Sequence, residues 1–99
     1  SVYTSVGQDE LAAWLQPLGL GELIAHAGIA AGMQNSNYFV TTTAGRFVLT
    51  LFEHIDPASL DFYLALQDRL AHAGLPCPQP LTDDQGRRWR MLAGKPAAL

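Results

Sequence analysis

Hydrophobic residues near the N-terminus recur with the spacing of one face of a helix. Four of them stand at positions i, i+3, i+4 and i+7: Leu11, Trp14, Leu15 and Leu18. This spacing is typical of an amphipathic helix. Ser5 followed three residues later by Gln8 matches a capping box, and the acidic pair at 9–10 lies where the helix dipole favours negative charge. We therefore predict a helix that begins after Ser5 and ends near Pro17 and Gly19.

Three runs rich in apolar, aromatic or β-branched residues come next, each bounded by glycine or by a turn. They are residues 22–31, 37–43 and 46–53. The connections between them are short, so the pattern predicts a three-stranded antiparallel meander.

A second helix is predicted from Asp56 and Pro57, because aspartate is a good N-cap and proline is favoured at the first helical position. Its apolar side carries Leu60, Tyr63, Leu64, Leu70 and Ala71. Gly74, with Pro76 just beyond it, is expected to end this helix.

The pattern in the last third of the chain predicts more strands. Residues 81–84 and 87–92 flank the turn Asp84-Gln85-Gly86 as a second hairpin, and residues 95–99 begin a further strand. The order of helix, three strands, helix and more strands indicates an α+β fold. We expect one antiparallel sheet of about five strands, packed against the second helix.

Composition narrows the function classes. The chain has 99 residues, of which 48% are hydrophobic and 15% charged, as in a single globular domain. The net charge is −3 and the six Lys and Arg residues form no stripe in the sequence, which argues against nucleic-acid binding. No apolar run is long enough for a membrane span, and the N-terminus has no signal-peptide pattern. Cys77 is the one cysteine, so a cytoplasmic protein fits.

The polar stretch Gln34-Asn35-Ser36-Asn37, which follows Gly28 and Gly32, connects the first two predicted strands. Glycines let a backbone approach phosphate groups closely, and a hairpin with a polar tip can cover them. The stretch matches neither GxxxxGK[ST] nor a full GxGxxG motif. An ordinary wide β-turn explains the same residues, because Asn and Ser favour turns. Pattern alone leaves both interpretations open.

Other residue types give weaker indications. The three histidines, at positions 26, 54 and 72, lack the spacing of metal ligands. Glu53-His54, at the end of a strand, either contacts a ligand or is solvated. Asp61 and Asp68 are expected on a solvated helix face, and Cys77 has no evident base beside it. The remaining residues considered are predicted to be exposed arginines (Arg87, Arg88, Arg90) and packing tryptophans (Trp14, Trp89).

Three segments resemble a known enzyme family. They are "GIAAGMQNSNYFVTTTAGRFVLTLFEH", "FYLALQDRLAHAGLPCPQPLTDDQGR" and "LAGKPAAL". Together they are similar to bacterial homoserine kinases related to aminoglycoside phosphotransferases and choline kinases. The resemblance covers essentially the whole chain. It implies that residues 1–99 are the N-terminal, nucleotide-binding lobe of a protein-kinase-like fold. The apolar run "GKPAAL" at the end also led us to expect a fragment, cut before the C-terminal catalytic lobe.

The resemblance also implies a nucleotide site. The loop over the ATP phosphates would be residues 32–37, and 48–51 would be the third strand. The implied contacts are Gly32, Gln34, Asn35, Ser36, Asn37 and Thr50. Most kinases carry a lysine on that strand, but this chain has Thr50 there and its single lysine is Lys95. Arg46, Mg²⁺ or groups of the other lobe would then neutralise the phosphates.

The activity implied is transfer of a phosphoryl group from ATP to L-homoserine, with Mg²⁺, giving ADP and O-phospho-L-homoserine on the way to threonine. The catalytic residues and metal ligands would belong to the absent lobe, so the fragment alone would be inactive. Two alternatives stay open: a sibling kinase for aminoglycosides or choline, and a standalone α+β binding module without chemistry.

Overall fold

The computed structural model describes residues 4–30 and 35–99. Its elements are α1 (Gln8–Leu15), a 3-10 helix η1 (Gln16–Leu18), β1 (Leu23–Gly28), β2 (Ser36–Thr42), β3 (Gly45–Leu51), α2 (Pro57–His72), β4 (Arg90–Leu92) and β5 (Lys95–Ala98). No helix among these described residues has the length and apolar character needed to cross a bilayer.

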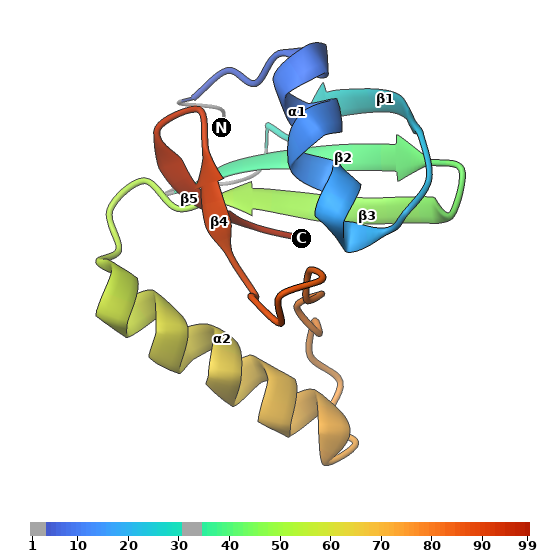
Figure 1. The fold of residues 1–99 in the computed structure, drawn as a ribbon. Helices are drawn as coiled ribbons and strands as arrows, with labels where there is room; N and C mark the ends of the chain where they lie inside the picture. Colours follow the sequence, from blue (N-terminus) through green and yellow to red (C-terminus); the bar gives the residue numbers. More distant parts are fainter. Residues whose placement is uncertain (1–3, 31–34) are drawn as a thin grey trace.

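The five strands form one antiparallel sheet in the order β1-β2-β3-β5-β4 (Figure 1). The first three strands are the predicted meander. In its register Tyr38 lies opposite Leu49, and Asn37 opposite Thr50. The last strand of the chain, β5, pairs with β3 through Leu51 and Ala97. The predicted α+β fold with about five antiparallel strands is confirmed.

Side chains on β2 and β3 alternate between the two faces of the sheet, as the strand geometry requires. Tyr38, Val40, Leu49 and Leu51 are buried on the face that α1 covers. Helix α1 adds Leu11, Trp14 and Leu15 to the same core. The opposite face is left open, and Phe39 and Val48 on it are 45% and 49% exposed.

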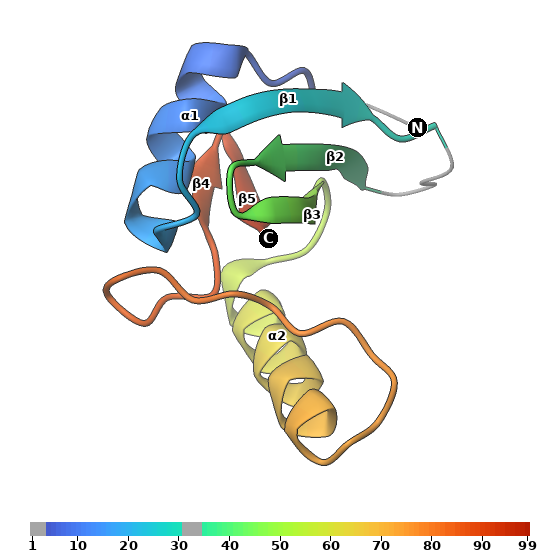
Figure 2. The same cartoon turned by 90° about the vertical axis from the view of Figure 1, so that its right-hand side faces the viewer.

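Helix α2 is held by a smaller apolar cluster. Leu60 and Leu64 pack with Phe52 and Ala98, and Ile55 and Trp89 lie against them. Figure 2 shows α2 extending away from the sheet. The expected packing of the sheet against this helix is present in the smaller cluster, while the larger core lies under α1. Helix α2 contacts the sheet through one narrow row of apolar side chains, Leu60 and Leu64, which pack on Phe52 and Ala98.

The start of α1 differs from the prediction at Ser5. Gly7 is the N-cap, and its N–H donates to the Glu10 carboxylate at 2.8 Å. The helix therefore begins at Gln8, and the reciprocal partner is Glu10 rather than Gln8. The start and end of α2 are confirmed: Asp56 accepts from Ser59 N–H at 2.9 Å, and the chain leaves the helix through Gly74 with φ of 88°.

The predicted hairpin over 81–92 is wrong in its first half, since residues 81–84 form no strand. The buried Asp83 carboxylate accepts from the backbone N–H groups of Gln85 and Arg87, each at 2.9 Å. These donors are thereby satisfied by a side chain, and a strand ladder is not needed to pair them. The hairpin that forms is the β4–β5 one, which begins at Arg90.

Candidate functional site

A cavity of about 560 Å³ lies on the open face of the sheet, between the strands, α2 and the connector 78–81. Figure 2 shows this face on the side away from α1. Val48, Leu81 and Leu99 give it apolar walls, and Asn37 and Thr50 give it a polar end. The volume and this mixture of linings are typical of sites for small organic ligands.

The polar end is built by facing positions of β2 and β3. Thr50 Oγ1 donates to Asn37 Oδ1 at 2.9 Å, and the Asn37 amide donates to the Asn35 carbonyl at 3.4 Å. The Asn35 side chain in turn accepts from the Glu53 N–H at 3.4 Å. Asn35, Asn37 and Thr50, which the sequence singled out, are thus brought together at the cavity.

Ser36 lies on the other face of β2. Its side chain is fully buried, and its hydroxyl donates to Glu53 Oε2 at 2.7 Å. Contact between Ser36 and a nucleotide remains a prediction. In the structure the Ser36 hydroxyl is bonded to Glu53 instead. Gly32 and Gln34, the other predicted contacts in the loop, lie outside the described residues.

No Lys, Arg, Asp or Glu side chain is among the described residues that line the cavity. Arg46 stacks over the Phe39 ring at 5.6 Å. It is four residues from Thr50 along β3, or about 13 Å. Lys95 pairs with Glu53 at 3.5 Å and does not line the cavity. Neither Arg46 nor Lys95 is therefore among the residues that line the cavity, and a contact between Arg46 and phosphate remains a prediction.

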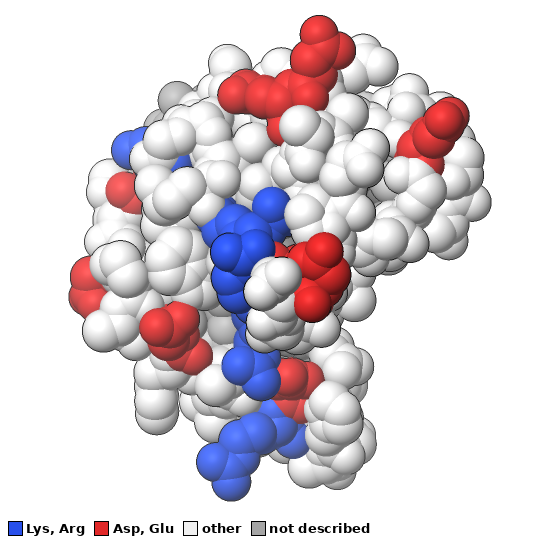
Figure 3. Space-filling model, in the orientation of Figure 1, with Lys and Arg blue, Asp and Glu red and all other residues white. Residues whose placement is uncertain are grey.

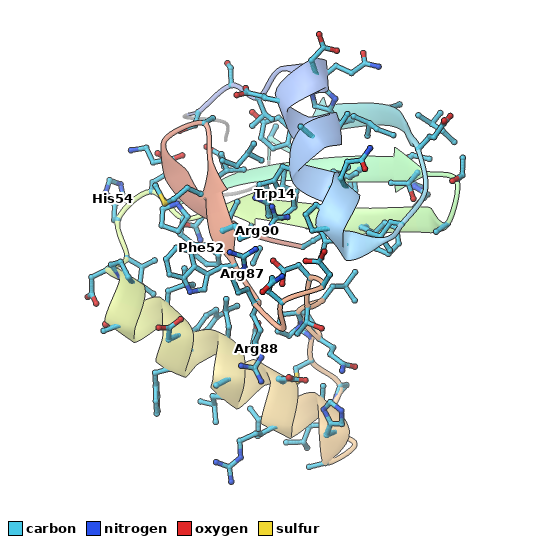
Figure 4. All side chains as sticks on the ribbon, in the orientation of Figure 1. Trp14, Phe52, His54, Arg87, Arg88 and Arg90 are labelled. Atoms are coloured by element: carbon cyan, nitrogen blue, oxygen red, sulfur yellow. The ribbon has the colours of Figure 1, made fainter. Side chains whose placement is uncertain are left out.

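A smaller hollow of about 360 Å³ continues from the polar end of the cavity. The two share Asn35, Phe52 and Tyr63, and the hollow adds His54 and Ile55. Figure 4 shows His54 on the connection from β3 to α2, with Phe52 between the sheet and the helix. His54 is exposed, so it borders this hollow as a solvent-accessible imidazole.

Helix α2 contributes lining residues that the sequence reasoning missed. Tyr63 and Gln67 lie one helical turn apart, and the Gln67 amide donates to the Tyr63 hydroxyl at 3.1 Å. Both line the cavity, as does Gln79 of the connector. The sequence did carry a signal for these residues, because Tyr63 and Gln67 stand four positions apart beside the apolar side of the helix.

Asp61 and Asp68 do not line the cavity and are not simply solvated. Asp61 accepts from Trp89 Nε1 at 2.6 Å, and Asp68 pairs with Arg88 at 2.9 Å. The hydrogen bond from Arg88 lowers the pKa of Asp68 below its ordinary value, against a smaller opposing effect of burial. Both carboxylates therefore tie α2 to the segment before β4 and lie outside the cavity lining.

Arginines gather on the face shown in Figure 3, in a band that runs from β4 to α2. Arg87, Arg88 and Arg90 border a second hollow, of about 860 Å³. Their charges are largely paired, because Asp83 contacts Arg87 at 2.9 Å and Arg90 at 3.1 Å, and Asp68 holds Arg88.

Arg90 was expected to be exposed, but only 18% of its side chain is accessible. Its guanidinium stacks on the Trp14 ring at 4.6 Å and donates to the Trp14 carbonyl (Figure 4). Trp14 lies in the larger core and Trp89 packs against the smaller one, which confirms that both are packing residues.

The remaining histidines have structural partners. His26 Nε2 lies 2.9 Å from the Val6 carbonyl, and His72 contacts Asp68. Within residues 4–30 and 35–99, no three His, Cys, Asp or Glu side chains are grouped so that they could hold a metal ion.

The chain is similar to known proteins. The family model described as "Phosphotransferase enzyme family" matches residues 26–98. The chain is 46% identical to a homoserine kinase of Burkholderia lata and 48% identical to one of Methylobacillus flagellatus, in both cases over all 99 residues. A homoserine kinase of Burkholderia ambifaria is 44% identical over the same length. The chain spans about 30% of the length of these curated relatives.

Proposed function

This chain belongs to the phosphotransferase enzyme family, and from that premise we propose that it is the nucleotide-binding lobe of a larger ATP-dependent kinase. The observation that carries the proposal is the cavity on the open face of the sheet. It brings Asn35, Asn37 and Thr50 together beside the connection between β1 and β2. In kinase-like folds that connection covers the phosphates.

The residues present fit ATP in part. Val48, Leu81 and Leu99 offer apolar surfaces to a planar base, and Gln79 offers an amide beside them. Asn35 and Asn37 offer amide groups at the end where phosphates would lie. The bound nucleotide would supply the γ-phosphoryl group for transfer, and the residues described here would bind and orient it.

The negative charge of the phosphates would be balanced by groups outside this cavity. Its described lining has neither a carboxylate to bind Mg²⁺ nor a cation to pair with phosphate. The metal ligands and the catalytic base would then belong to the rest of the protein. The share of the relatives' length that this chain covers leaves room for such a lobe.

L-homoserine is the substrate we propose, with ADP and O-phospho-L-homoserine as products, in a cytoplasmic enzyme of threonine biosynthesis. The support is the printed name of the relatives at 44–48% identity. The lobe described here offers no separate feature for choosing among hydroxyl substrates, so the other lobe would select the acceptor.

The test is a phosphotransfer assay on the full-length protein with ATP and Mg²⁺. Separate reactions would contain L-homoserine, choline or an aminoglycoside, and ADP formation would be followed together with the mass of the product. We expect turnover with L-homoserine and the mass of a phosphorylated amino acid. Turnover only with choline or an aminoglycoside would refute the substrate. No turnover and no ATP binding would refute the kinase assignment itself.

A further inference from the structure

Glu53, two residues after the end of β3, is a buried carboxylate that the proposed site does not use. Only 6% of its side chain is exposed. Glu53 Oε2 accepts from Ser36 Oγ and from Thr4 Oγ1, each at 2.7 Å. Lys95 Nζ lies 3.5 Å from the other carboxylate oxygen. Three segments that are distant in the sequence therefore meet at this one side chain.

Glu53 holds two consecutive residues, Asn35 just before β2 and Ser36 at its start. Its carboxylate holds the Ser36 hydroxyl, and its backbone N–H donates to Asn35 Oδ1 at 3.4 Å. The Ser36 oxygen also accepts from the Thr4 N–H at 2.9 Å. The chain thus leaves the β1–β2 connection with both residues tied to the end of the neighbouring strand.

The direction of Asn37 depends on this attachment. Side chains alternate along a strand, so holding Ser36 on the buried face fixes Asn37 on the open face. Asn37 there pairs with Thr50 at the polar end of the cavity. A loss of the Ser36 contact would loosen the backbone at the start of β2 and, with it, the placement of the neighbouring Asn35 and Asn37 amides.

We propose that Glu53 is a positioning residue for the nucleotide: it anchors Ser36 and Asn35, and thereby aims the Asn35 and Asn37 amides at the phosphate end of the cavity. This inference rests on the proposed function. It also gives the single lysine of the chain a role, because Lys95 balances the charge of Glu53 instead of contacting phosphate.

The ionisation of Glu53 supports the same role. Burial alone raises its pKa, but the hydrogen bonds from Ser36 and Thr4 and the charge of Lys95 outweigh it. The net effect lowers the pKa, so the carboxylate stays ionised at neutral pH and accepts both hydroxyl groups. An ionised acceptor makes stronger hydrogen bonds than a neutral one.

The experiment measures MgATP affinity and steady-state kinetics of the full-length protein with Glu53→Gln and Ser36→Ala, singly and together. Asp83→Asn is the matched control, because Asp83 is likewise a buried carboxylate with several hydrogen-bond donors, here backbone N–H groups and an arginine, and it lies outside the cavity. Melting temperatures of all variants are recorded alongside.

We expect Glu53→Gln and Ser36→Ala each to raise KM and Kd for MgATP about tenfold, with kcat at saturating ATP changed less than about threefold. The double variant should be no worse than the poorer single one, because both changes break one contact. Asp83→Asn should lower the melting temperature and leave MgATP affinity within about twofold of wild type.

Unchanged MgATP affinity in Ser36→Ala, or additive effects in the double variant, would overturn the inference. If Glu53→Gln fails to fold, Ser36→Ala decides alone, since it removes one hydroxyl and keeps the charge pair. Failure of the wild type to bind MgATP would refute the proposed function and the inference together. Normal wild-type binding with unaffected variants would refute only the inference.

Discussion

In the proposed nucleotide site, Thr50 would present a neutral hydroxyl near the strand position where most kinases have a lysine. Its bond to Asn37 holds that amide at the cavity. Thr50→Val keeps the shape of the side chain and removes the donor. We expect KM for ATP to rise about three- to tenfold, the effect of one lost hydrogen bond and a less ordered amide. Steady-state kinetics at saturating homoserine measure this change.

Thr41→Val is the control for this substitution. Thr41 lies on the same face of the sheet, on β2 opposite Arg46, and does not line the cavity. Its replacement should leave KM for ATP within about twofold of wild type. Equal effects of the two substitutions would mean that Thr50 acts only through the general stability of the sheet.

Glu53 should make stability depend on pH. Its pKa is lower in the folded protein than its ordinary value of 4.5, so its stabilising contribution is complete above that value. The contribution is lost as the pH falls through the folded-state pKa. Glu53→Gln should therefore melt several degrees below wild type at pH 7, with the gap closing below pH 4.5. A gap that stays constant with pH would contradict this assignment.

At this scale the sequence identified which residues meet but not which way they face. Asn35, Asn37 and Thr50 were all named in advance and do lie together. Ser36 was named with them, yet its hydroxyl is buried on the opposite face. In a run of four polar residues, no hydrophobic residue indicates which side chains face the core. Which face each side chain takes therefore depends on the contact with Glu53.

Among the elements, the packing of α2 should depend on one narrow row of buried apolar side chains. Leu60 is fully buried, whereas Leu66 on the same helix is 43% exposed. Leu60→Ala should lower the free energy of unfolding by about 2–5 kcal/mol. Leu66→Ala, the same chemical change, should cost about 1 kcal/mol or less. Urea unfolding followed by tryptophan fluorescence compares the two, and equal losses would show that the outer side of α2 is also packed.

Element starts were predictable where one side chain supplies the signal. Asp56 and Pro57 define the beginning of α2 by their own capping chemistry. The start of α1 was misjudged because Ser5 and Gln8 also satisfy the capping pattern, while the bond from Gly7 to Glu10 forms instead. The predicted first strand of the 81–92 hairpin was wrong for a similar reason. The Asp83 carboxylate accepts the backbone N–H groups of Gln85 and Arg87.

The assembly of the whole molecule lay beyond local patterns. Insertion of β5 between β3 and β4, and the choice of α1 rather than α2 for the larger core, depend on contacts between distant segments. The cavity is likewise made from β2, β3, α2, the connector 78–81 and the last residues. Sequence periodicity predicts which faces are apolar, and it does not say which of them pair.

The 99-residue chain by itself should have no phosphotransfer activity. The described side chains that line its cavity include amides but no carboxylate, imidazole, lysine or arginine. Incubation of the chain with MgATP and L-homoserine should therefore give no ADP above background, while the full-length protein turns over. Homoserine phosphorylation by the chain alone would refute this division of roles between lobes.

The central claim is that the cavity on the open face of the sheet binds the nucleotide. The most direct measurement is a crystal structure of the full-length protein with Mg²⁺ and a non-hydrolysable ATP analogue. We expect the base to lie against Val48 and Leu99, with the phosphates beside Asn35 and Asn37. An analogue bound instead in the hollow bordered by Arg87 and Arg88, with the sheet cavity empty, would contradict it.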